Sequence, residues 1–595
     1  MFEKNPRLTY WNVAPKSVER AALVRAPQAF MTENGITALL CSLGEASMLI
    51  DFKEEVVGGL VVRLRCAADT HVLIQYEEEP EAAIRREPYA CTWYKEPQDE
   101  YDLPAGEHVI VSKGRRGFRY AALFVMGTEN VELISVEAVN GGWPVRMRGS
   151  FRCSDERLNR IWDISAATVR ACMQDFYEDG VKRDGLLWIG DYRIAFMAGW
   201  YAFGEAALAR RSLLMIRDSQ LECGAIPACC AEGGGHQHDR ESGISYMPGI
   251  PKNLGGWVIL NYLADYLCAI DEYIVRTGDL SILDETLESA EKTARFMLTL
   301  TDLETPGQWW IDEYEAKRDE NGLRYSIHHD CKNMPNMNIG SKGGVLCEML
   351  SGLKALIRLA DRAQNAELKM WGEEMAGKLD NHIETYYHEA FFNQYTDLAK
   401  QKAPAVSQHV TMRAVLAGKE DKKGMERLAR MLLPNMSFAL AWRVEAMMRS
   451  GHVHEALRDI RAAWGKMLDA DSLTCWERLD VPEMNATHYY DAPGSYCHGW
   501  GSSPAWQLPE WIVGVHPVKD GFEEICVEPN LDELEWAEAC VPVPDGEITV
   551  RAEKSADGLK LLLDIPEGVR KCVVKWPDGS METLEAAGAY ALTGR

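Results

Sequence analysis

Acidic and aromatic side chains are concentrated in one short segment, residues 175–191. Its seventeen residues include five acids, two bases and three aromatic rings, and Gly180, Gly185 and Gly190 interrupt any regular helix. Carboxylates accept hydrogen bonds and transfer protons, and flat ring faces pack against apolar C–H surfaces. Sites that bind sugars need both. The plainer alternative for such a segment is a polar surface loop with fortuitous charge pairs.

Two later segments carry acids and rings of the same kind. Glu477 follows Trp476 at the start of a loop within residues 474–480, and His498 lies between aromatic residues and glycines within residues 495–501. A single histidine is more often a hydrogen-bonded core or loop residue than a catalyst. We nevertheless expect the three segments together to line one concave site.

The elements that must position these segments change along the chain. Residues 1–147 contain short apolar or alternating runs separated by Gly, Pro and Asp turns, which is typical of β-strands. Residues 60–65 and 71–76 are two of these runs, and residues 119–125 with 131–137 have the pattern of the closing hairpin of a jelly roll. The pattern predicts an N-terminal antiparallel β-sandwich.

From about Phe151 the apolar period changes from two to about 3.6, and helical patterns continue to residue 518. Ser154 and Asp155 are candidate caps for the first helix. Many helices with apolar faces and long loops favour a central all-α (α/α)6 toroid for residues 148–518, although periodicity alone also fits a plain bundle. The later helices include residues 257–277, 283–301, 344–362, 367–387, 437–449 and 454–466.

Strand patterns return in residues 519–595, with runs at 525–529, 547–551, 559–564 and 572–576. Short runs of this kind predict a small C-terminal antiparallel β-sandwich. In the toroid between the two sandwiches, the first and last helical hairpins would be neighbours. Acids near residues 184 and 477 would therefore meet at its mouth.

The composition excludes several classes of function. The formal net charge of the 595 residues is −26 and the pI is about 5.1, and a field of that sign repels nucleic acids and anionic membranes. The N-terminus does not have the pattern of a signal peptide, and no apolar run approaches the ~20 residues that span a bilayer. Sixteen scattered cysteines suit reduced core thiols. We expect a cytoplasmic address and no nucleic-acid or membrane partner.

No cofactor or metal is expected. The chain has no glycine-rich phosphate loop and no GxSxG sequence, which leaves nucleotide chemistry and serine hydrolysis without support. The pair His236 and His238, like His328 and His329, has no evident third ligand and is interpreted as part of a loop.

Residues 172–191 resemble the signature of the family 78 glycoside hydrolases, the bacterial α-L-rhamnosidases. In that signature an Asp, a downstream acid and a Trp-x-Gly-Asp follow one another at near-constant spacing, as Asp179, Asp184 and Trp188 to Asp191 do here. Residues 149–155 resemble the family's entry into its helical domain, residues 475–477 its late carboxylate segment, and residues 495–517 and 541–548 its C-terminal region. The resemblance covers most of the chain.

The resemblance implies an inverting exo-glycosidase that hydrolyses terminal α-L-rhamnosyl linkages in glycosides or oligosaccharides. By position in the signature, Glu477 is the general base and Asp184 the general acid. Inverting glycosidases hold two such carboxyl groups about 6.5–9.5 Å apart so that a water molecule fits beside the sugar. The resemblance also implies sugar-binding roles for Asp179, Asp191 and His498. The other candidate sugar-binding residues are Arg183, Trp188, Trp257 and Trp476.

The acid position departs from the family pattern. The family usually has Glu there, whereas the sequence has Asp184, which is one methylene shorter, followed by Gly185. Glu178 is the alternative acid, with neighbours that suggest a structural role. Arg183 is expected to pair with a carboxylate and so to hold the loop.

The tryptophans also differ in rank. Trp188 is the first choice for a ring that faces the sugar, while Trp257, Trp476 and Trp500 rank lower. Each of them has a core role as its alternative.

Two other functions remain open. The same toroid could host a polysaccharide lyase or a glycosidase of different specificity, because one fold supports several reactions. The departure at Asp184 also fits a non-catalytic sugar-binding homologue. A homodimer is possible, and the sequence does not define the aglycone or the linkage.

Overall fold

The computed structural model describes residues 4–25, 38–40, 44–85, 97–230, 237–239, 244–246, 257–301, 323–327, 341–389, 394–396, 407–482, 494–585 and 587–594. The chain divides into two compact units, each built from segments far apart in the sequence. The first unit contains residues 1–144, 167–185 and 467–501, and the second contains residues 145–166, 186–466 and 502–595. The domains predicted at 1–147, 148–518 and 519–595 are continuous in sequence, whereas each of these units combines three separate segments of the chain.

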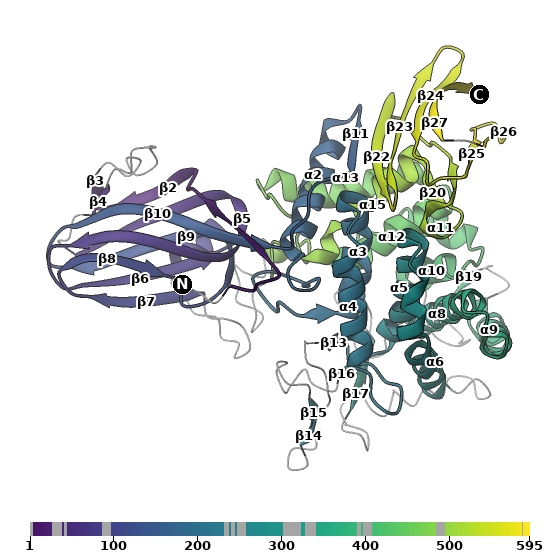
Figure 1. The fold of residues 1–595 in the computed structure, drawn as a ribbon, viewed down its shortest axis with the longest axis horizontal. Coiled ribbons are helices and arrows are strands. Elements are labelled where there is room, and N and C mark those ends of the chain that lie inside the picture. Colours follow the sequence, from purple (N-terminus) through teal and green to yellow (C-terminus); the bar gives the residue numbers. More distant parts are fainter. Residues whose placement is uncertain are drawn as a thin grey trace. The chain divides into compact units, whose positions relative to one another are not determined.

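The first unit is built on an antiparallel sheet that is drawn in purple and blue in Figure 1. Its central path runs β3-β4-β10-β5-β9-β6-β7, with β1 on β10 and with β2 and β8 on β5. The strands are β1 (Thr9–Val13), β2 (Ser17–Ala22), β3 (Val24–Arg25), β4 (Ala38–Leu40), β5 (Gly44–Cys66), β6 (Thr70–Glu77), β7 (Gln98–Leu103), β8 (Gly106–Val111), β9 (Arg116–Gly127) and β10 (Val131–Gly142), with the short helix α1 (Pro80–Arg85) after β6.

The long strand β5 organises this sheet. Its first half pairs with β2 and β9, its register against β9 shifts between Asp51 and Val56, and its second half pairs with β8 and β10. One strand thereby serves two sets of neighbours that enclose a common apolar core, which includes Phe52, Leu64 and Phe118. The predicted runs at 60–65, 71–76, 119–125 and 131–137 all lie within these strands.

Helices occupy the middle of the chain, as the change of period predicts. The predicted starts and ends agree within a few residues, and Ser437–Arg449 agrees at both ends; the one exception is residues 257–259, which form a strand before α5 begins. The helices are α2 (Glu156–Cys172), α3 (Ile189–Phe203), α4 (Ala207–Asp218), α5 (Leu260–Thr277), α6 (Leu283–Thr299), α8 (Lys342–Arg362), α9 (Ala366–Tyr386), α10 (Gln408–Leu416), α11 (Lys422–Leu428), α12 (Ser437–Arg449), α13 (Val453–Asp469) and α15 (Pro504–Leu508).

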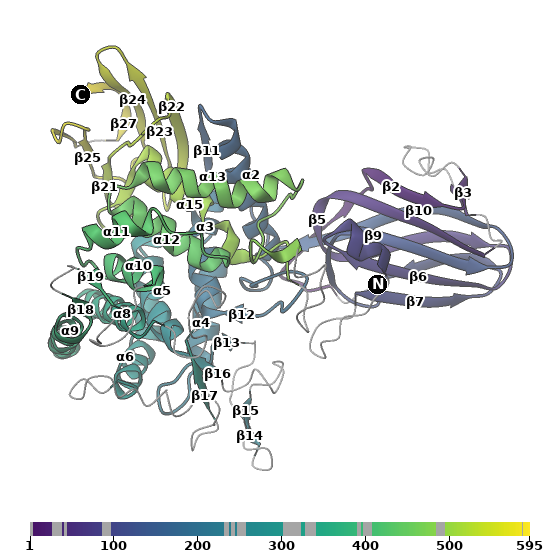
Figure 2. The ribbon, with the colours of Figure 1, turned by 180° about the vertical axis from the view of Figure 1, so that it is seen from behind.

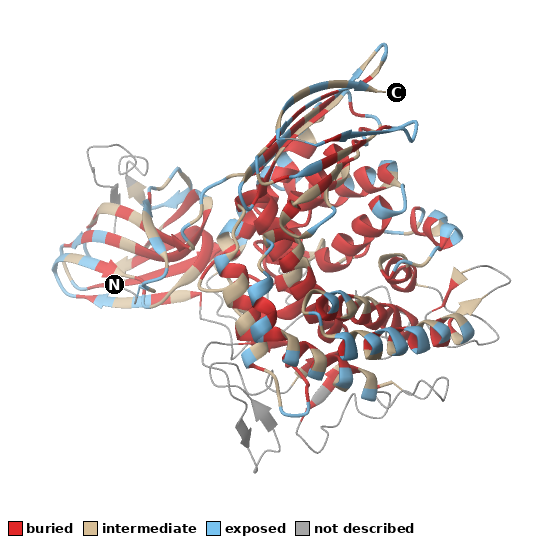
Figure 3. Cartoon of the chain, turned by 45° about the vertical axis from the view of Figure 1, so that its right-hand side comes forward, coloured by how far each residue is buried: buried red, intermediate tan, exposed pale blue. Residues whose placement is uncertain are grey.

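Helices such as α6 and α9 pack by one face, whereas α3 and α12 are buried on nearly every side. In Figure 3 some helical ribbons are red on one side and tan or pale blue on the other, and others are red throughout. In the second unit α5 packs against α3, α6 and α8, and α9 packs on the far side of α8 at the edge of the helical region (Figure 2). Gly204 and Gly278 end α3 and α5 in the left-handed conformation, which is the usual way for a helix to stop before a turn.

Charged side chains also lie between the inner helices of the second unit. Arg193 on α3 pairs with Asp265 on α5 at 2.8 Å, and Arg413 on α10 pairs with Glu348 on α8 at 2.8 Å. These groups line a polar cavity of about 350 Å³. The core of the helical region is therefore partly ionic.

Two sheets follow the helices in the second unit. One has the order β11-β22-β23-β24-β27 and the other β20-β21-β25-β26. The strands are β11 (Ser150–Cys153), β20 (Val515–Pro517), β21 (Glu524–Val527), β22 (Trp536–Val543), β23 (Gly546–Ser555), β24 (Gly558–Ile565), β25 (Lys571–Lys575), β26 (Met581–Leu584) and β27 (Gly588–Gly594). The sandwich expected here was antiparallel throughout, but β21 pairs with β25 in parallel, so that expectation is corrected at this pair.

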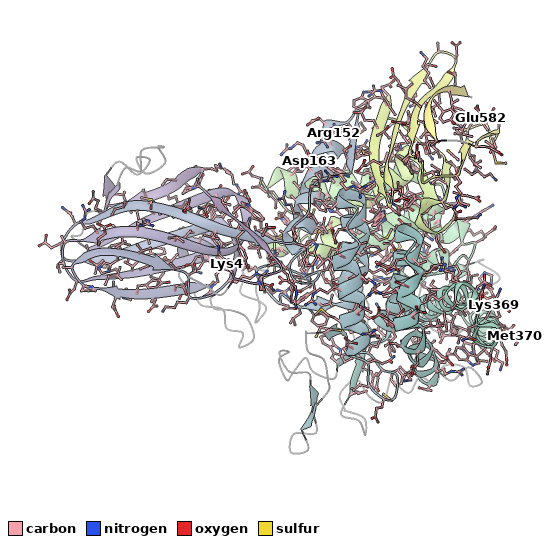
Figure 4. All side chains as sticks on the ribbon, in the orientation of Figure 1. Lys4, Arg152, Asp163, Lys369, Met370 and Glu582 are labelled. Carbon is pink, nitrogen blue, oxygen red and sulfur yellow. The ribbon has the colours of Figure 1, made fainter. Side chains whose placement is uncertain are left out.

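Strand β11 adds a second difference. Residues 149–155 were expected only to lead into the helices, yet Ser150–Cys153 forms the edge strand beside β22. Arg152 of β11 pairs with Asp163 of α2 at 2.9 Å, and both are labelled in Figure 4. A chain segment that precedes the helices thus completes a sheet that follows them.

The remaining described strands are short pairs. They are β12 (Leu187–Trp188) with β13 (Cys229–Cys230), β14 (Gln237–Asp239) with β15 (Ile244–Tyr246), β16 (Trp257–Ile259) with β17 (Arg324–Ser326), and β18 (His388–Glu389) with β19 (Gln394–Tyr395). His236 and residues 328–330 lie outside the described residues, as does the side chain of His238 on β14. In the part of the chain that the structure describes, no helix is long and apolar enough to cross a bilayer.

The cap of α2 provides a first test. Oδ1 of Asp155 accepts a hydrogen bond from Arg157 N at 2.8 Å, and its other oxygen pairs with Arg461. We expect Asp155→Ala to lower the free energy of unfolding by about 1–2 kcal/mol, because both the cap and the pair are lost. Asp155→Asn keeps the cap and should lose less than about 1 kcal/mol. Urea denaturation followed by circular dichroism measures both, and equal losses would assign the effect to the ion pair instead.

Candidate active site

Three loop segments of the first unit, residues 172–185, 472–482 and 494–501, form the candidate active site. Backbone hydrogen bonds link the two later segments, from Glu477 N to Ser495 O at 3.0 Å and from His498 N to Cys475 O at 3.0 Å. The backbone of the first segment reaches the third through a bridge between Gly180 and His498. The segments that carry the predicted acids and the histidine are therefore in contact.

Gly180 permits this approach. A Cβ atom at this position would lie 2.7 Å from Arg183 O and 3.1 Å from a ring carbon of His498, closer than side-chain carbons normally come. Gly185 has φ +66°, a conformation that glycine adopts without strain. The two glycines thus shape the turn that presents Arg183 and Asp184.

Glu477 is a strongly perturbed acid of the site. It is 7% exposed, it forms an ion pair with Arg183, and it accepts a hydrogen bond from Ser495 N at 3.1 Å. Burial alone would raise its pKa, but Arg183, His498 and the Ser495 N–H favour the charged form and lower the pKa of Glu477 to about 2. The carboxylate is therefore ionised throughout the neutral pH range.

Asp184 shares Arg183 with Glu477. Nη1 of Arg183 lies 3.3 Å from the Asp184 carboxylate, while Nη2 contacts Glu477. Asp184 is partly buried. The guanidinium thus lies between the two predicted catalytic carboxylates, and the expectation that Arg183 pairs with a carboxylate is confirmed.

His498 is buried beside Asp179. Its Nε2 lies 3.6 Å from Asp179 Oδ2, and its ring packs on Trp500 with the ring centroids 4.2 Å apart. The indole N–H of Trp500 donates to Glu477 O at 3.0 Å. Asp179, His498 and Glu477 are thus held in one buried network, in which Trp500 supports the loop.

Trp476 has the packing of a core residue. It is 1% exposed, its Nε1 donates to Ser472 Oγ at 2.9 Å, and its ring meets Tyr496 edge-on at 5.3 Å. A ring enclosed in this way presents no face to a sugar. The core role that was the alternative for each tryptophan therefore describes Trp476.

Three of the predicted residues belong to the second unit. Trp188 lies on β12 immediately before α3, where it is 8% exposed, and its ring meets Trp257 edge-on at 5.7 Å. Trp257 begins β16 and donates from Nε1 to Ser326 Oγ at 2.7 Å. Asp191 is buried in the first turn of α3. Trp188 and Trp257 therefore form one aromatic pair, with Trp257 partly exposed.

Glu178 is engaged in a pair of its own. Its Oε2 lies 2.6 Å from Arg115, which lies in the turn between β8 and β9, and its side chain is buried. This contact supports the structural role that its neighbours suggested.

Glu78 was not predicted as a site residue from the sequence. This residue follows β6 within the run Glu77-Glu78-Glu79, which has the pattern of a solvated charged turn. In the structure it is 6% exposed and binds the backbone of residues 496 and 497. Its only sequence signal is a run of acids at the end of an apolar strand.

The second unit also contains a candidate metal group. Within the described residues, His454, Asp532 and Glu533 have ligand atoms within 4.8 Å of one another, and all three are exposed. His454 already pairs with Asp532 at 3.0 Å. Exposed acids often cluster in this way without an ion.

Two family models match the chain. A bacterial alpha-L-rhamnosidase 6 hairpin glycosidase domain matches residues 146–312, and a bacterial alpha-L-rhamnosidase C-terminal domain matches residues 514–588. Among characterised proteins, an alpha-L-rhamnosidase of Alteromonas sp. (strain LOR) is 27% identical over 121 residues, which are 20% of this chain and 13% of that protein.

Solved structures of rhamnosidases share the fold. The family 78 rhamnosidase of Bacillus sp. GL1 has a TM-score of 0.76 and 25% identity, covering 91% of this chain and 54% of that one. The Klebsiella oxytoca rhamnosidase with rhamnose bound has a TM-score of 0.66 and 20% identity, covering 85% and 96%. Residues 146–312 and 514–588 thus resemble domains of the bacterial alpha-L-rhamnosidases, and the chain shares the fold of a glycoside hydrolase family 78 rhamnosidase.

The chain is shorter than several of these relatives. The matched residues cover 13% of the Alteromonas protein, and the structural match covers 54% of the Bacillus protein. The similarity therefore concerns the matched domains and the fold.

The lowered pKa of Glu477 provides a second test. Because its pKa lies below the ordinary value of 4.5, its ionised form stabilises the fold above that pH, and this contribution disappears as the pH falls toward 2. It is on the order of 3 kcal/mol. We therefore expect Glu477→Gln to be less stable than the wild type at pH 6, and the difference to shrink between pH 4.5 and 3. Urea midpoints at pH 6, 4.5 and 3 measure it, and a constant difference would contradict the ion pair.

Proposed function

We propose that the protein is an inverting exo-glycosidase that hydrolyses terminal α-L-rhamnosyl linkages in glycosides or oligosaccharides. The observation that carries the proposal is the buried, ionised Glu477, which lies beside Arg183 and in one network with His498 and Asp179. Buried carboxylates with strongly perturbed pKa values occur preferentially at functional sites. Two relatives of the same fold contain rhamnose in their structures.

In the proposed reaction Asp184 is the general acid and Glu477 the general base. Asp184 donates a proton to the glycosidic oxygen while the bond from that oxygen to the anomeric carbon breaks. Glu477 takes a proton from a water molecule that attacks the anomeric carbon from the opposite face of the ring. The products are L-rhamnose of inverted configuration, which gains the hydroxyl of the water, and the free alcohol, which gains the proton of Asp184. The proton taken up by Glu477 goes to the solvent, from which Asp184 is protonated again.

Arg183 has two roles in this proposal. In the ligand-free structure it holds Glu477 ionised, but a carboxylate with a pKa near 2 is a weak base at neutral pH. If the guanidinium turns to a hydroxyl of the sugar, Glu477 loses its main stabilising partner and its pKa rises. Substrate binding would thus strengthen the base at the moment when it is needed.

The remaining sugar contacts are proposed from family position for the polar residues and from their aromatic rings for the tryptophans. Asp179, Asp191 and His498 are proposed to bind hydroxyl groups, and the partly exposed Trp257 with Trp188 to face the apolar side of the sugar. The helices of residues 148–518 are proposed to complete the (α/α)6 toroid expected from their periodicity. No metal takes part in the proposed reaction.

The assignment of acid and base can be tested with two leaving groups. Asp184→Asn should lower kcat for an alkyl α-L-rhamnoside by about 100-fold or more, because the departing alkoxide needs a proton. The loss should be much smaller for a dinitrophenyl rhamnoside, whose phenolate leaves unprotonated. Glu477→Gln should lower kcat for both substrates alike, because both need an activated water. An equal loss in Asp184→Asn for both substrates would remove Asp184 as the acid.

Glu178→Gln is the matched control for this series. Glu178 is an acid of the same segment that pairs with Arg115, and we expect its variant to retain the wild-type dependence on the leaving group. If Glu178→Gln instead shows the selective loss with the alkyl substrate, Glu178 is the acid.

The reaction class is tested by the products. Proton NMR during turnover should show the released rhamnose first in the anomer opposite to that of the substrate, before mutarotation. Retained configuration would exclude the inverting mechanism, and a product that absorbs in the near ultraviolet would indicate a lyase. Calorimetric binding of L-rhamnose without hydrolysis of any aryl glycoside would indicate a sugar-binding homologue.

A further inference from the structure

A buried carboxylate of the N-terminal sheet binds the loop that carries His498. Glu78 follows β6, and its Oε1 accepts hydrogen bonds from Ser495 Oγ at 3.1 Å and Cys497 N at 2.9 Å. Its Oε2 accepts one from Tyr496 N at 2.9 Å. One side chain thereby satisfies two consecutive backbone amides and a hydroxyl of a loop more than 400 positions later in the chain.

The same carboxylate lies beside the first catalytic segment. Lys182 Nζ lies 2.7 Å from Glu77 and 3.8 Å from Glu78, and Lys182 is adjacent in sequence to Arg183. Apolar contacts support this arrangement, since Val57 of β5 packs with Val181 and Cys497 in a small buried cluster. The sheet thus contacts both segments that meet at Glu477.

The residues that bind Glu78 also contact or adjoin the groups proposed to react. Ser495, whose hydroxyl binds Glu78, donates its N–H to Glu477 Oε2 at 3.1 Å. Cys497, whose N–H binds Glu78, directly precedes His498. Glu78 binds the amides of Tyr496 and Cys497, which lie between Ser495 and His498. The positions of the Ser495 N–H and of the His498 ring therefore depend on Glu78.

A carboxylate at this buried position is unfavourable unless its charge is compensated. Burial raises the pKa of Glu78 to about 7, although Lys182 and the Tyr496 N–H favour its charged form. Burial and the charge of Glu78 also raise the pKa of the buried Glu55. Burying a charge costs free energy unless hydrogen bonds offset it, so the cost is offset only while the loop keeps its geometry.

We propose that Glu78 is a positioning residue, which holds the loop of residues 495–498 so that Ser495 and His498 are presented correctly to Glu477 and to the sugar. Glu78 touches no reacting atom in this proposal and acts through the loop. The inference rests on the proposed function for its effect on catalysis, but the contacts of Glu78 with the loop can be tested without it.

The test uses Glu78→Gln and a matched control, Asp99→Asn. Asp99 is a buried carboxylate of the same sheet that likewise accepts three hydrogen bonds, from Tyr76 Oη at 3.0 Å, Lys113 N at 3.0 Å and Arg116 at 3.1 Å. None of these three donors belongs to the loop segments of the candidate site. Both substitutions exchange a buried carboxylate for an amide of the same shape, so general damage to the sheet should be similar.

Hydrogen exchange of the full-length protein reads the contact directly. Glu78→Gln offers one acceptor oxygen in place of two, so the amides of Tyr496 and Cys497 should exchange at least about tenfold faster. Asp99→Asn should leave these amides unchanged and accelerate the amide of Lys113 instead. Unchanged exchange at 496 and 497 in Glu78→Gln would overturn the proposal, whether or not the protein is active.

Kinetics then separates positioning from loss of folded protein. On an aryl α-L-rhamnoside we expect kcat of Glu78→Gln to fall by at least about tenfold, with a smaller change in KM. The stoichiometry of L-rhamnose binding should stay that of the wild type. Asp99→Asn should keep wild-type kcat. A fall in kcat shared by both variants, or matched by a fall in stoichiometry, would make the role of Glu78 structural and overturn the proposal.

Ser495→Ala gives a second, milder variant. It removes one of the three donors to Glu78 and leaves both backbone amides in place, so it should show the same changes in smaller measure. A wild-type protein without glycosidase activity would contradict the proposed function, while the exchange at 496 and 497 would still decide the role of Glu78.

Discussion

The candidate site depends on how buried loop backbone is satisfied. Residues 175–185, 474–481 and 494–498 contain little regular secondary structure, yet most of them are buried, and buried N–H and C=O groups need hydrogen-bond partners. Here carboxylates supply part of the hydrogen bonding that the backbone of a helix or sheet would supply. Glu477 accepts from Ser495 N and Glu78 from Tyr496 N and Cys497 N, so the groups that shape the loop include the group proposed to act on water.

The electrostatics of the site follow from this use of buried carboxylates as hydrogen-bond acceptors. Glu477 is buried beside the guanidinium of Arg183 and its pKa is lowered to about 2, whereas the pKa of Glu78, beside Lys182, is raised to about 7. Burial acts on both carboxylates in the same direction. The close contact with Arg183 reverses the effect at Glu477, while Lys182, which lies nearer Glu77, does not reverse it at Glu78. The pKa values of Glu477 and Glu78 thus differ because Arg183 contacts Glu477 closely, whereas Lys182 lies farther from Glu78.

Several differences between expectation and structure share one cause. Trp476 lies next to Glu477 in sequence and was a lower-ranked candidate to face the sugar with a core role as its alternative, and its ring packs on Tyr496 within the core. Residues 150–153 were expected only to precede the helices, but they pair with β22. The β21 and β25 strands pair in parallel although each has an ordinary strand pattern. Each outcome depends on a partner distant in sequence, which local periodicity does not contain.

The sequence by itself determined the order of strands, helices and strands, most helix ends, and the acids and histidine that meet at the site, because periodicity, capping residues and motif spacing are local properties. Asp179, Arg183, Asp184, Glu477 and His498 were all named from it. Only the tertiary structure decided that Arg183 lies between Asp184 and Glu477, that Trp476 is enclosed, and that Glu78 holds the amides of the last loop. A run of three glutamates has the same pattern whether it is solvated or buried, since burial depends on the whole fold.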